Sequence, residues 1–479
     1  MPRKTSKRKQ SAAPRQQRMA GAKLASAIPQ GVSPATMRDA VLGRDLPRAV
    51  SLIVLFLLIL QIALNFARFD GRPVGLNNPT AAGVAARDFF PARLRHQNID
   101  TPGWVLTGLM LPTNAPRERA MRPLYPLPVT LARVLGVVPA DPGLKALPAG
   151  AQAYGSVGAS LFPAIHVLQF TNACLALLSG WLFFAFCRRF GFSPPAATCA
   201  ALVAGSGFGF SFWVVQATPE LFGYTTVIVT LVLAMIAHET DVPRELTGVS
   251  RLLRQGCIWG CVGSVVGIML LGKESFNLPI FVGLLLLLSR RWVGVLTFSA
   301  ATLLPTLLWN YYMARIVKAY DPAEYLRQYK FVVWLWQDLG NLPWSERLAA
   351  IGKNFTTQVV CLGRAYAYVP LIVAAIGIAL GRNTIPRRGI LLACFFMSLY
   401  LLFLASNFIM PRLMFLSWPA VYFFAWVAVE RLAVFAERAG RPGAPVNPTG
   451  PRRWAIRLTA LAGFMALGTR DHFDWYFYG

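Results

Sequence analysis

Charged side chains near long apolar segments are the residues of this sequence best placed to do chemistry. Placing a charge in or next to lipid is costly, so each charged group found there is a candidate for function. A carboxylate can act as a general base, and Arg or Lys can bind a phosphate group. Four acids and four basic residues form this set: Asp70, Asp88, Glu220, Glu274, Arg72, Arg122, Lys273 and Arg412. Together they predict a polar cleft at the outer surface of a membrane.

Each of these residues also has a purely structural interpretation. Asp70 equally fits a solvated side chain where the first apolar segment leaves the bilayer. Asp88 fits the polar face of a surface helix, and Arg412 fits an arginine that extends to the membrane interface. Lys273 and Glu274 fit a turn between two helices, because adjacent helical positions point about 100° apart and need not pair. The hypothesis of a site therefore depends on the set as a whole.

Other motifs in the sequence indicate packing rather than catalysis. The spacings Gly256 to Gly260 and Gly263 to Gly267 are GxxxG patterns, which are typical of closely packed membrane helices. The glycines at 205, 207 and 209 have no following Lys-Ser/Thr, which favours packing over phosphate binding. The four histidines show no metal-binding spacing, and the seven cysteines include no CxxC pair. The sequence therefore predicts neither a metal site built from these residues nor a disulfide framework.

The composition indicates that lipid is the main solvent of this chain. Hydrophobic residues make up 55% of the 479 residues and charged residues only 14%, whereas roughly a quarter of an ordinary soluble domain is charged. The formal net charge is +27, but Lys and Arg cluster between the apolar segments instead of forming one stripe. This distribution argues against a nucleic-acid partner and fits a membrane topology.

Apolar segments of about 20 residues predict an all-α fold, a polytopic transmembrane helical bundle with about eleven spans. The segments lie at 49–66, 162–187, 195–216, 219–237, 256–272, 275–289, 292–313, 355–380, 389–406, 412–430 and 455–468. Residues 1–48 contain eleven Lys or Arg and two acids. We expect them to form a disordered basic cytoplasmic tail before a single transmembrane domain at 49–479. The composition of this tail also overlaps with that of an organelle transit peptide.

The positive-inside rule orients these spans. With the tail in the cytoplasm, every short Arg-rich connection falls on the cytoplasmic side and the C-terminus is external. The longest connections, 68–161 and 314–354, are then external loops. Within the first loop, apolar residues recur at helical spacing in 80–94 and 124–138, which predicts amphipathic helices on the membrane surface. The charged residues named above then share the external side.

The order of these elements resembles that of the GT-C superfamily, polytopic membrane glycosyltransferases that use polyprenyl-phosphate sugars, including mannosyltransferases and aminoarabinose transferases. A first span and a long external loop with an early acid begin the resemblance, which covers residues 49–430 in layout. Short segments carry it: Arg122–Pro126 (RPLYP), Asn172–Phe190 followed by Gly191–Ser193, Thr218–Glu220 (TPE), Gly272–Ser275 (GKES), and Pro411–Leu413 with Trp418–Pro419. Asp70 is followed by Gly71, where the family usually has Tyr or a second acid. The catalytic acid is therefore either Asp70 or Asp88.

The resemblance implies a single inverting displacement on the external side, with no covalent enzyme intermediate. Asp70 would be the general base, with Asp88 as the alternate, because the acceptor hydroxyl must lose a proton. Arg122, Lys273 and Arg412 would hold the departing phosphate. Glu220 and Glu274 would orient the acceptor sugar or a phosphate-binding Lys. The predicted substrate-binding set also includes Arg72 and Tyr125.

The same resemblance implies a bacterial inner membrane and three kinds of partner. These are the lipid bilayer, a polyprenyl-phosphate sugar donor, and a glycan, lipid or protein acceptor. A nucleotide cofactor is not expected, because the predicted cytoplasmic connections are short and Arg-rich and lack paired acids. Some members of the superfamily need a divalent metal and others do not, so a metal remains an open alternative.

Two other classes of membrane protein compete with a glycosyltransferase. A transporter or flippase of lipid-linked glycans predicts charged residues in the middle of spans, facing a cavity. Here most charges sit at span ends, apart from Arg364. A polysaccharide polymerase usually has its largest external loop late in the chain, whereas the longest loop here comes first. The sequence therefore favours the enzyme over both alternatives.

Overall fold

The computed structural model describes most of the apolar part of the chain. The chain divides into two compact units, Met1–Arg44 and Asp45–Gly479, and the described residues all belong to the second. They are residues 48–69, 101–111, 122–139, 162–241, 248–273, 275, 277–316, 339–381, 389–405, 414–440 and 450–469. The predicted surface helix at 80–94 and nearly all of the predicted tail lie outside these ranges.

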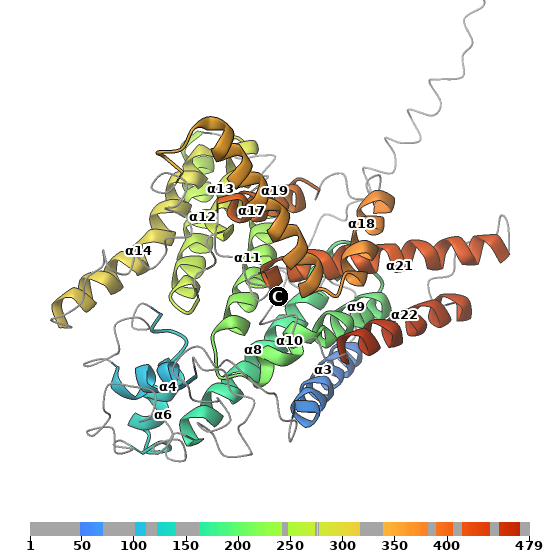
Figure 1. Cartoon of the computed structure of the whole chain (residues 1–479), viewed down its shortest axis with the longest axis horizontal. Helices are drawn as coiled ribbons and strands as arrows, with labels where there is room; N and C mark the ends of the chain where they lie inside the picture. Colours follow the sequence, from blue (N-terminus) through green and yellow to red (C-terminus); the bar gives the residue numbers. More distant parts are fainter. Residues whose placement is uncertain are drawn as a thin grey trace, which may run out of the picture. The chain divides into compact units, whose positions relative to one another are not determined.

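Every regular element within the described ranges is a helix (Figure 1), so the predicted all-α fold class is confirmed. The helices are α3 (Arg48–Phe69), α4 (Thr101–Met110), α6 (Leu127–Val134), α8 (Phe162–Arg189), α9 (Pro194–Ser206), α10 (Phe208–Val215), α11 (Glu220–Thr240), α12 (Gly248–Leu270), α13 (Asn277–Leu288), α14 (Trp292–Ile316), α17 (Trp344–Ala365), α18 (Val369–Gly381), α19 (Gly389–Ala405), the 3-10 helix η5 (Phe415–Ser417), α21 (Trp418–Gly440) and α22 (Pro451–Thr469).

The length and composition of these helices identify a multi-pass integral membrane protein. Among the described helices, α3, α8, α11, α12, α14 and α21 are long and apolar enough to cross a membrane. The pair α17 and α18, which meet at a bend of 103°, would make a seventh if they form one span. The predicted number of about eleven is therefore not confirmed. Helices α13 and α19 have only 12 and 17 residues, and α22 is not among the six.

The predicted span 195–216 forms two helices, α9 and α10, because the backbone between them is extended at Gly207 (φ −56°, ψ 138°). Side chains from other helices donate hydrogen bonds to carbonyls near the end of α9. The Gln61 amide of α3 donates to the Leu202 carbonyl at 2.6 Å, and the Trp418 indole of α21 donates to the Ala204 carbonyl at 2.9 Å. Irregular backbone at membrane depth is tolerated where such partners satisfy it.

Helices α8 and α11 run in the same direction, side by side. Near the middle of the pair, the hydroxyls of Ser179 and Thr225 are 2.9 Å apart. At one end Arg189 donates to Glu239 at 2.7 Å, and at the other end α11 begins at Glu220. A helix of 21 residues is about 30 Å long, the thickness of the hydrocarbon layer. Helix α11 is therefore long enough to place the charged groups at its two ends at opposite faces of a membrane.

Helices α12 and α14 pack closely through glycine, as the GxxxG pattern of Gly263 and Gly267 predicts. A Cβ atom at Gly263 would lie 2.5 Å from the Phe298 carbonyl oxygen, and one at Gly267 would lie 2.5 Å from that of Thr302. Real Cβ atoms do not approach a carbonyl so closely, so both positions depend on glycine for backbone contact. This pair fixes the position of the end of α12, where Lys273 follows.

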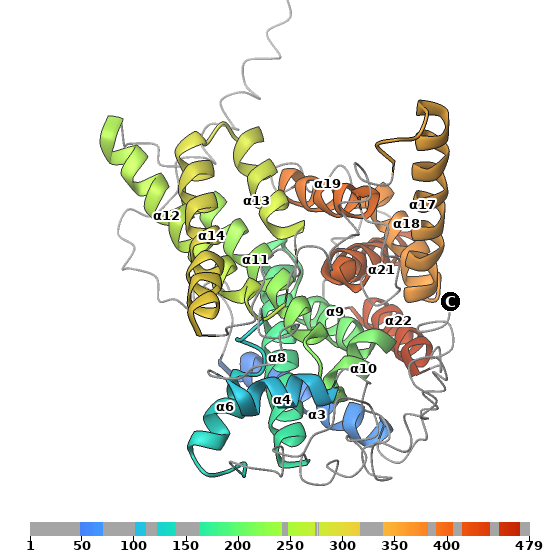
Figure 2. The same cartoon turned by 60° about the vertical axis from the view of Figure 1, so that its left-hand side comes forward.

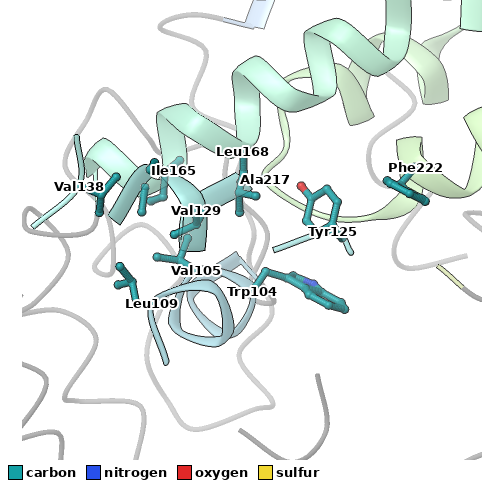
Figure 3. Close-up of a cluster of buried hydrophobic side chains, with 12 residues drawn as sticks. Trp104, Val105, Leu109, Tyr125, Val129, Val138, Ile165, Leu168, Ala217 and Phe222 are labelled. Atoms are coloured by element: carbon teal, nitrogen blue, oxygen red, sulfur yellow. The ribbon is translucent and has the colours of Figure 1, made fainter. Parts of the chain in front are cut away.

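A small apolar core joins α4, α6 and α8 to the beginning of α11 (Figures 2 and 3). Helix α6 belongs to the segment predicted as an amphipathic surface helix. It buries Val129 in this core and exposes Leu131 and Val134. Helix α4 was not predicted from the sequence, and it contributes the buried Trp104 and Val105. The core holds the loop before α6 against the first turn of α11.

Candidate functional site

The structure describes four of the nine predicted site residues, and it brings them together. They are Arg122, Tyr125, Glu220 and Lys273. The other five lie outside the described residues: Asp70, Arg72, Asp88, Glu274 and Arg412. The two candidate bases therefore remain predictions, and the observed site consists of the predicted substrate-binding groups.

An ion pair between Glu220 and Lys273 forms the centre of this site. Lys273 Nζ lies 3.3 Å from Glu220 Oε1, although the two residues are 53 positions apart. Their side chains are only 7% and 16% exposed. A buried ion pair is weak evidence for stability, because desolvation offsets the attraction between the charges. The pair is therefore more informative as a candidate for function than as a stabilising contact.

The local sequence explains how the two side chains meet. Glu220 is the first residue of α11, where the helix dipole favours a negative charge. Lys273 lies just after α12, and its aliphatic stem passes over Gly223 in the first turn of α11. A Cβ at Gly223 would lie 3.0 Å from Lys273 Cγ, so glycine leaves the room that the lysine uses. The Leu124 amide donates to the Leu271 carbonyl at 3.3 Å and ties the RPLYP segment to the same corner.

Tyr125 and Arg122 reach this corner from the RPLYP segment. The ring of Tyr125 is fully buried and contacts Trp104 and Phe222 edge to face, with centroids 5.6 Å and 6.5 Å apart (Figure 3). The guanidinium carbon of Arg122 lies 5.6 Å from the centroid of the Trp104 ring. This is a cation–π contact, which orients the charge and leaves its N–H groups able to donate in the ring plane.

The hydroxyl of Tyr125 is held in its neutral form. Burial raises its pKa well above the ordinary value of 10.0, and the negative charge of Glu220 raises the pKa further. The neighbouring Asn172 side chain partly opposes these effects. The hydroxyl therefore keeps its proton at neutral pH and can donate a hydrogen bond, within the electrostatic influence of Glu220.

Asn172 of α8 fixes the turn that leads into Glu220. Its amide nitrogen donates to the carbonyls of Trp213, Gln216 and Thr218, at 3.2 Å and 3.4 Å for the first and third. Gln169, one turn earlier in α8, donates to the Val215 carbonyl at 3.0 Å. Neither amide belongs to the predicted site, although Asn172 begins one of the segments that resemble the GT-C superfamily. The available signal was their polarity within a long apolar segment, where a polar side chain must find partners.

Three further polar side chains lie around the ion pair and were also missed. Thr218, Ser275 and Asn277 are buried, and their side-chain oxygens have no hydrogen-bond partner in the part of the chain that the structure describes. Leaving a buried polar atom without a partner costs about 1–3 kcal/mol. A polar ligand or bound water would remove that cost. From the sequence alone, such residues at helix ends are ordinary helix caps.

The opposite end of α11 has a different character. There the Asp241 carboxylate lies 3.0 Å from Arg291 and accepts hydrogen bonds from Gln255 at 3.3 Å and from the Trp259 indole at 3.0 Å. These partners satisfy the carboxylate, which favours a structural role. Arg364, the one charge predicted in the middle of a span, lies in the last turn of α17, at the bend before α18. It is therefore at a helix end, and it lies inside the span if α17 and α18 cross the membrane as one.

No three His, Cys, Asp or Glu side chains gather in a way that could hold a metal within the described residues. The acids Asp70, Asp88 and Glu274 are outside those ranges, so the alternative of a divalent metal stays open. The comparisons of this chain with models of protein families, with curated proteins and with solved structures found no match.

Proposed function

We propose that this protein is a membrane glycosyltransferase that transfers a sugar from a polyprenyl-phosphate donor to an acceptor at the outer membrane surface. The observation that carries the proposal is the partly buried Glu220–Lys273 pair beside the neutral hydroxyl of Tyr125, at the end of a membrane-spanning helix. The resemblance of the RPLYP, TPE and GKES segments to the GT-C superfamily supports it. All three segments meet in this one place.

These groups suit the departure of a lipid phosphate. In the proposed reaction, the acceptor hydroxyl attacks the anomeric carbon while the bond to the phosphate oxygen breaks. The phosphate leaves with the bonding electrons and gains negative charge, which Lys273 and Arg122 stabilise. Tyr125 donates a hydrogen bond to a phosphate or sugar oxygen. The acceptor proton passes to a carboxylate, Asp70 or Asp88, and Glu220 orients Lys273.

The position of the site also suits an amphiphilic donor. Glu220 begins a helix that is long enough to cross the hydrocarbon layer. A polyprenyl chain can then lie against the apolar helices while its phosphate reaches the ion pair. Thr218, Ser275 and Asn277 offer buried hydrogen-bonding groups beside it for sugar hydroxyls.

The test is sugar transfer in proteoliposomes, with polyprenyl phosphates that carry mannose or aminoarabinose as donors. We expect Lys273→Gln to reduce transfer by about 100-fold, since a charge-assisted contact to phosphate contributes roughly 1.5–3 kcal/mol. Lys353→Gln, which removes an exposed lysine of α17, is the matched control and should retain full activity. Equal activity of the two variants would contradict the role of Lys273.

Asp70→Asn and Asp88→Asn, assayed separately, test the base. We expect only one of them to abolish transfer, because a single carboxylate accepts the proton in an inverting displacement. Full activity in both variants would remove both residues from the catalytic assignment.

A transporter or flippase remains the second candidate, because the break between α9 and α10 resembles the discontinuous helices of transporters. Against it, the carbonyls of Leu202 and Ala204 at this break accept hydrogen bonds from Gln61 and Trp418. A carbonyl that already accepts a hydrogen bond from the protein has less capacity left for a passing substrate. A labelled donor lipid that crosses the bilayer without losing its sugar would favour the transporter.

A further inference from the structure

An apolar groove lies between α18, α21 and α22 and shares no residue with the polar site. Its volume is about 870 Å³, near the upper end of the range for small-molecule sites. Aliphatic and aromatic side chains line it, among them Ile376 and Leu380 of α18, Leu432 and Phe435 of α21, and Phe464 of α22. Phe435 is 69% exposed and Leu432 is 57% exposed. An exposed apolar surface of this kind is more stable in contact with hydrocarbon than in contact with water.

Two arginines, Arg431 and Arg438, are the charged residues in the lining of this groove. They are seven positions apart on α21, so they share one face and lie about 10 Å apart along the axis. Neither forms an ion pair with an acid among the described residues. The acids that directly precede them, Glu430 and Glu437, are engaged by Arg457 at 2.7 Å and Arg453 at 2.8 Å. Helix α21 thus directs its acids to α22 and its arginines into the groove.

The arginine end of the groove lies level with the end of α8 that is farther from the polar site. Arg457 of α22 also reaches the Ser193 hydroxyl at 3.5 Å, and Ser193 lies just beyond the end of α8 that carries Arg189. The polar site contacts α8 nearer its other end, through Asn172. In the predicted orientation the end with Arg189 is cytoplasmic, where anionic lipids are enriched and attract basic side chains.

We propose that this groove binds an anionic glycerophospholipid of the surrounding bilayer. Its acyl chains lie along α18, α21 and α22, and its phosphate binds the guanidinium groups of Arg431 and Arg438. The forked N–H groups of arginine match phosphate oxygens, and the apolar lining matches the chains. The donor lipid is a poorer match, because the site that would use its phosphate is at the other face.

The test uses the full-length protein in detergent and native mass spectrometry, with equal concentrations of dioleoylphosphatidylglycerol and dioleoylphosphatidylcholine. We expect tighter binding of the anionic lipid, and a loss of about tenfold in its affinity in Arg431→Gln/Arg438→Gln, since charge-assisted contacts to phosphate are lost. The control Arg251→Gln/Arg452→Gln removes two exposed arginines outside the groove. It should keep the affinity of the parent. Equal affinities in the two double variants would overturn the proposal.

A second pair of variants tests the apolar part of the groove. Gly463 of α22 lines the groove, and a Cβ there has no atom within 4 Å, so Gly463→Leu fills the space without a backbone clash. We expect it to lower the binding of both lipids. Gly352→Leu, at an equally open glycine of α17 outside the groove, should bind them as the parent does. Unchanged binding in Gly463→Leu would count against the groove. Displacement of the phospholipid from the groove by a polyprenyl phosphate would also count against the proposal. A dimer that is disrupted only in Gly463→Leu would do so as well, because the groove would then be an interface between two copies of the chain.

Discussion

At the residue scale, the site depends on which protons its buried groups keep. Tyr125 has a raised pKa because its hydroxyl is buried and faces the negative charge of Glu220. A group whose pKa is raised on folding keeps its proton in the folded protein after the unfolded chain has lost it. Its contribution to stability is therefore complete below pH 10 and falls as the pH rises through the higher value of the folded state. At neutral pH the hydroxyl keeps its proton and can donate a hydrogen bond.

Tyr125→Phe removes this donor and leaves the ring in place. We expect sugar transfer to fall by about tenfold, the worth of one hydrogen bond to a charged phosphate, with no change in the shape of the pH profile between pH 6 and 9. We also expect the tyrosinate absorbance of the folded parent and of Tyr125→Phe to be the same up to pH 10. A difference between the two should appear only above that pH, where Tyr125 loses its proton. Tyr400→Phe, at an exposed tyrosine, is the matched control. A tyrosinate signal near neutral pH that disappears with Tyr125 would contradict the neutral donor.

At the element scale, the chain order of the helices was more predictable than their lengths. Long apolar runs predicted α3, α8, α11 and α14 within about three residues at each end, since hydrophobic length is a local property of the sequence. Helix α12 begins at Gly248, well before its predicted start at 256. The break at Gly207 and the bend between α17 and α18 were not predictable in this way. The break at Gly207 has partners from distant segments, Gln61 and Trp418, which reach the backbone only in the folded protein. At the bend, the Tyr366 hydroxyl lies 2.9 Å from that of Ser417.

The candidate site shows the same division. Because both residues are charged and lie near span ends, Glu220 and Lys273 were predicted as site residues. The alternation of the predicted spans placed both on the external side of the membrane. The contact between them could not be derived from the sequence. They are 53 positions apart, and the contact depends on how α11 packs against α12. The polar side chains around them were missed because Asn172, Thr218 and Ser275 carry no charge. Their importance follows from burial, which the sequence does not show.

Asn172 should act through the turn between α10 and α11. Asn172→Leu keeps the branching and the number of heavy atoms of the side chain but removes the amide that donates to the carbonyls of Trp213, Gln216 and Thr218. We expect a loss of about 2–3 kcal/mol in the free energy of unfolding, together with reduced transfer, since Glu220 follows this turn. Thr171→Ala is the control, because within the described part of the chain that hydroxyl bonds to the Val167 carbonyl of its own helix. Thermal unfolding in detergent compares the variants, and equal midpoints would mean that the turn is held by other contacts.

At the scale of the whole molecule, the two ends of α11 lie at opposite membrane faces, and the predicted orientation makes the polar site external. Single cysteines can test this in a background where the seven native cysteines are replaced by alanine. Val134→Cys lies on exposed α6, beside the core that carries Tyr125, and Arg251→Cys lies at the exposed beginning of α12. We expect a membrane-impermeant maleimide to label Val134→Cys in intact cells. Arg251→Cys should react only after the membrane is opened.

The opposite pattern would have a direct consequence for the proposed reaction. If Arg251→Cys reacted in intact cells and Val134→Cys did not, Glu220, Lys273 and Tyr125 would face the cytoplasm. The arginines of α21 would then lie in the outer leaflet, away from the leaflet in which anionic lipids attract basic residues. The polar site and the arginines of the lipid groove lie towards opposite ends of the same helical bundle. An inverted orientation would therefore move both to the wrong membrane face. One labelling experiment tests both proposals.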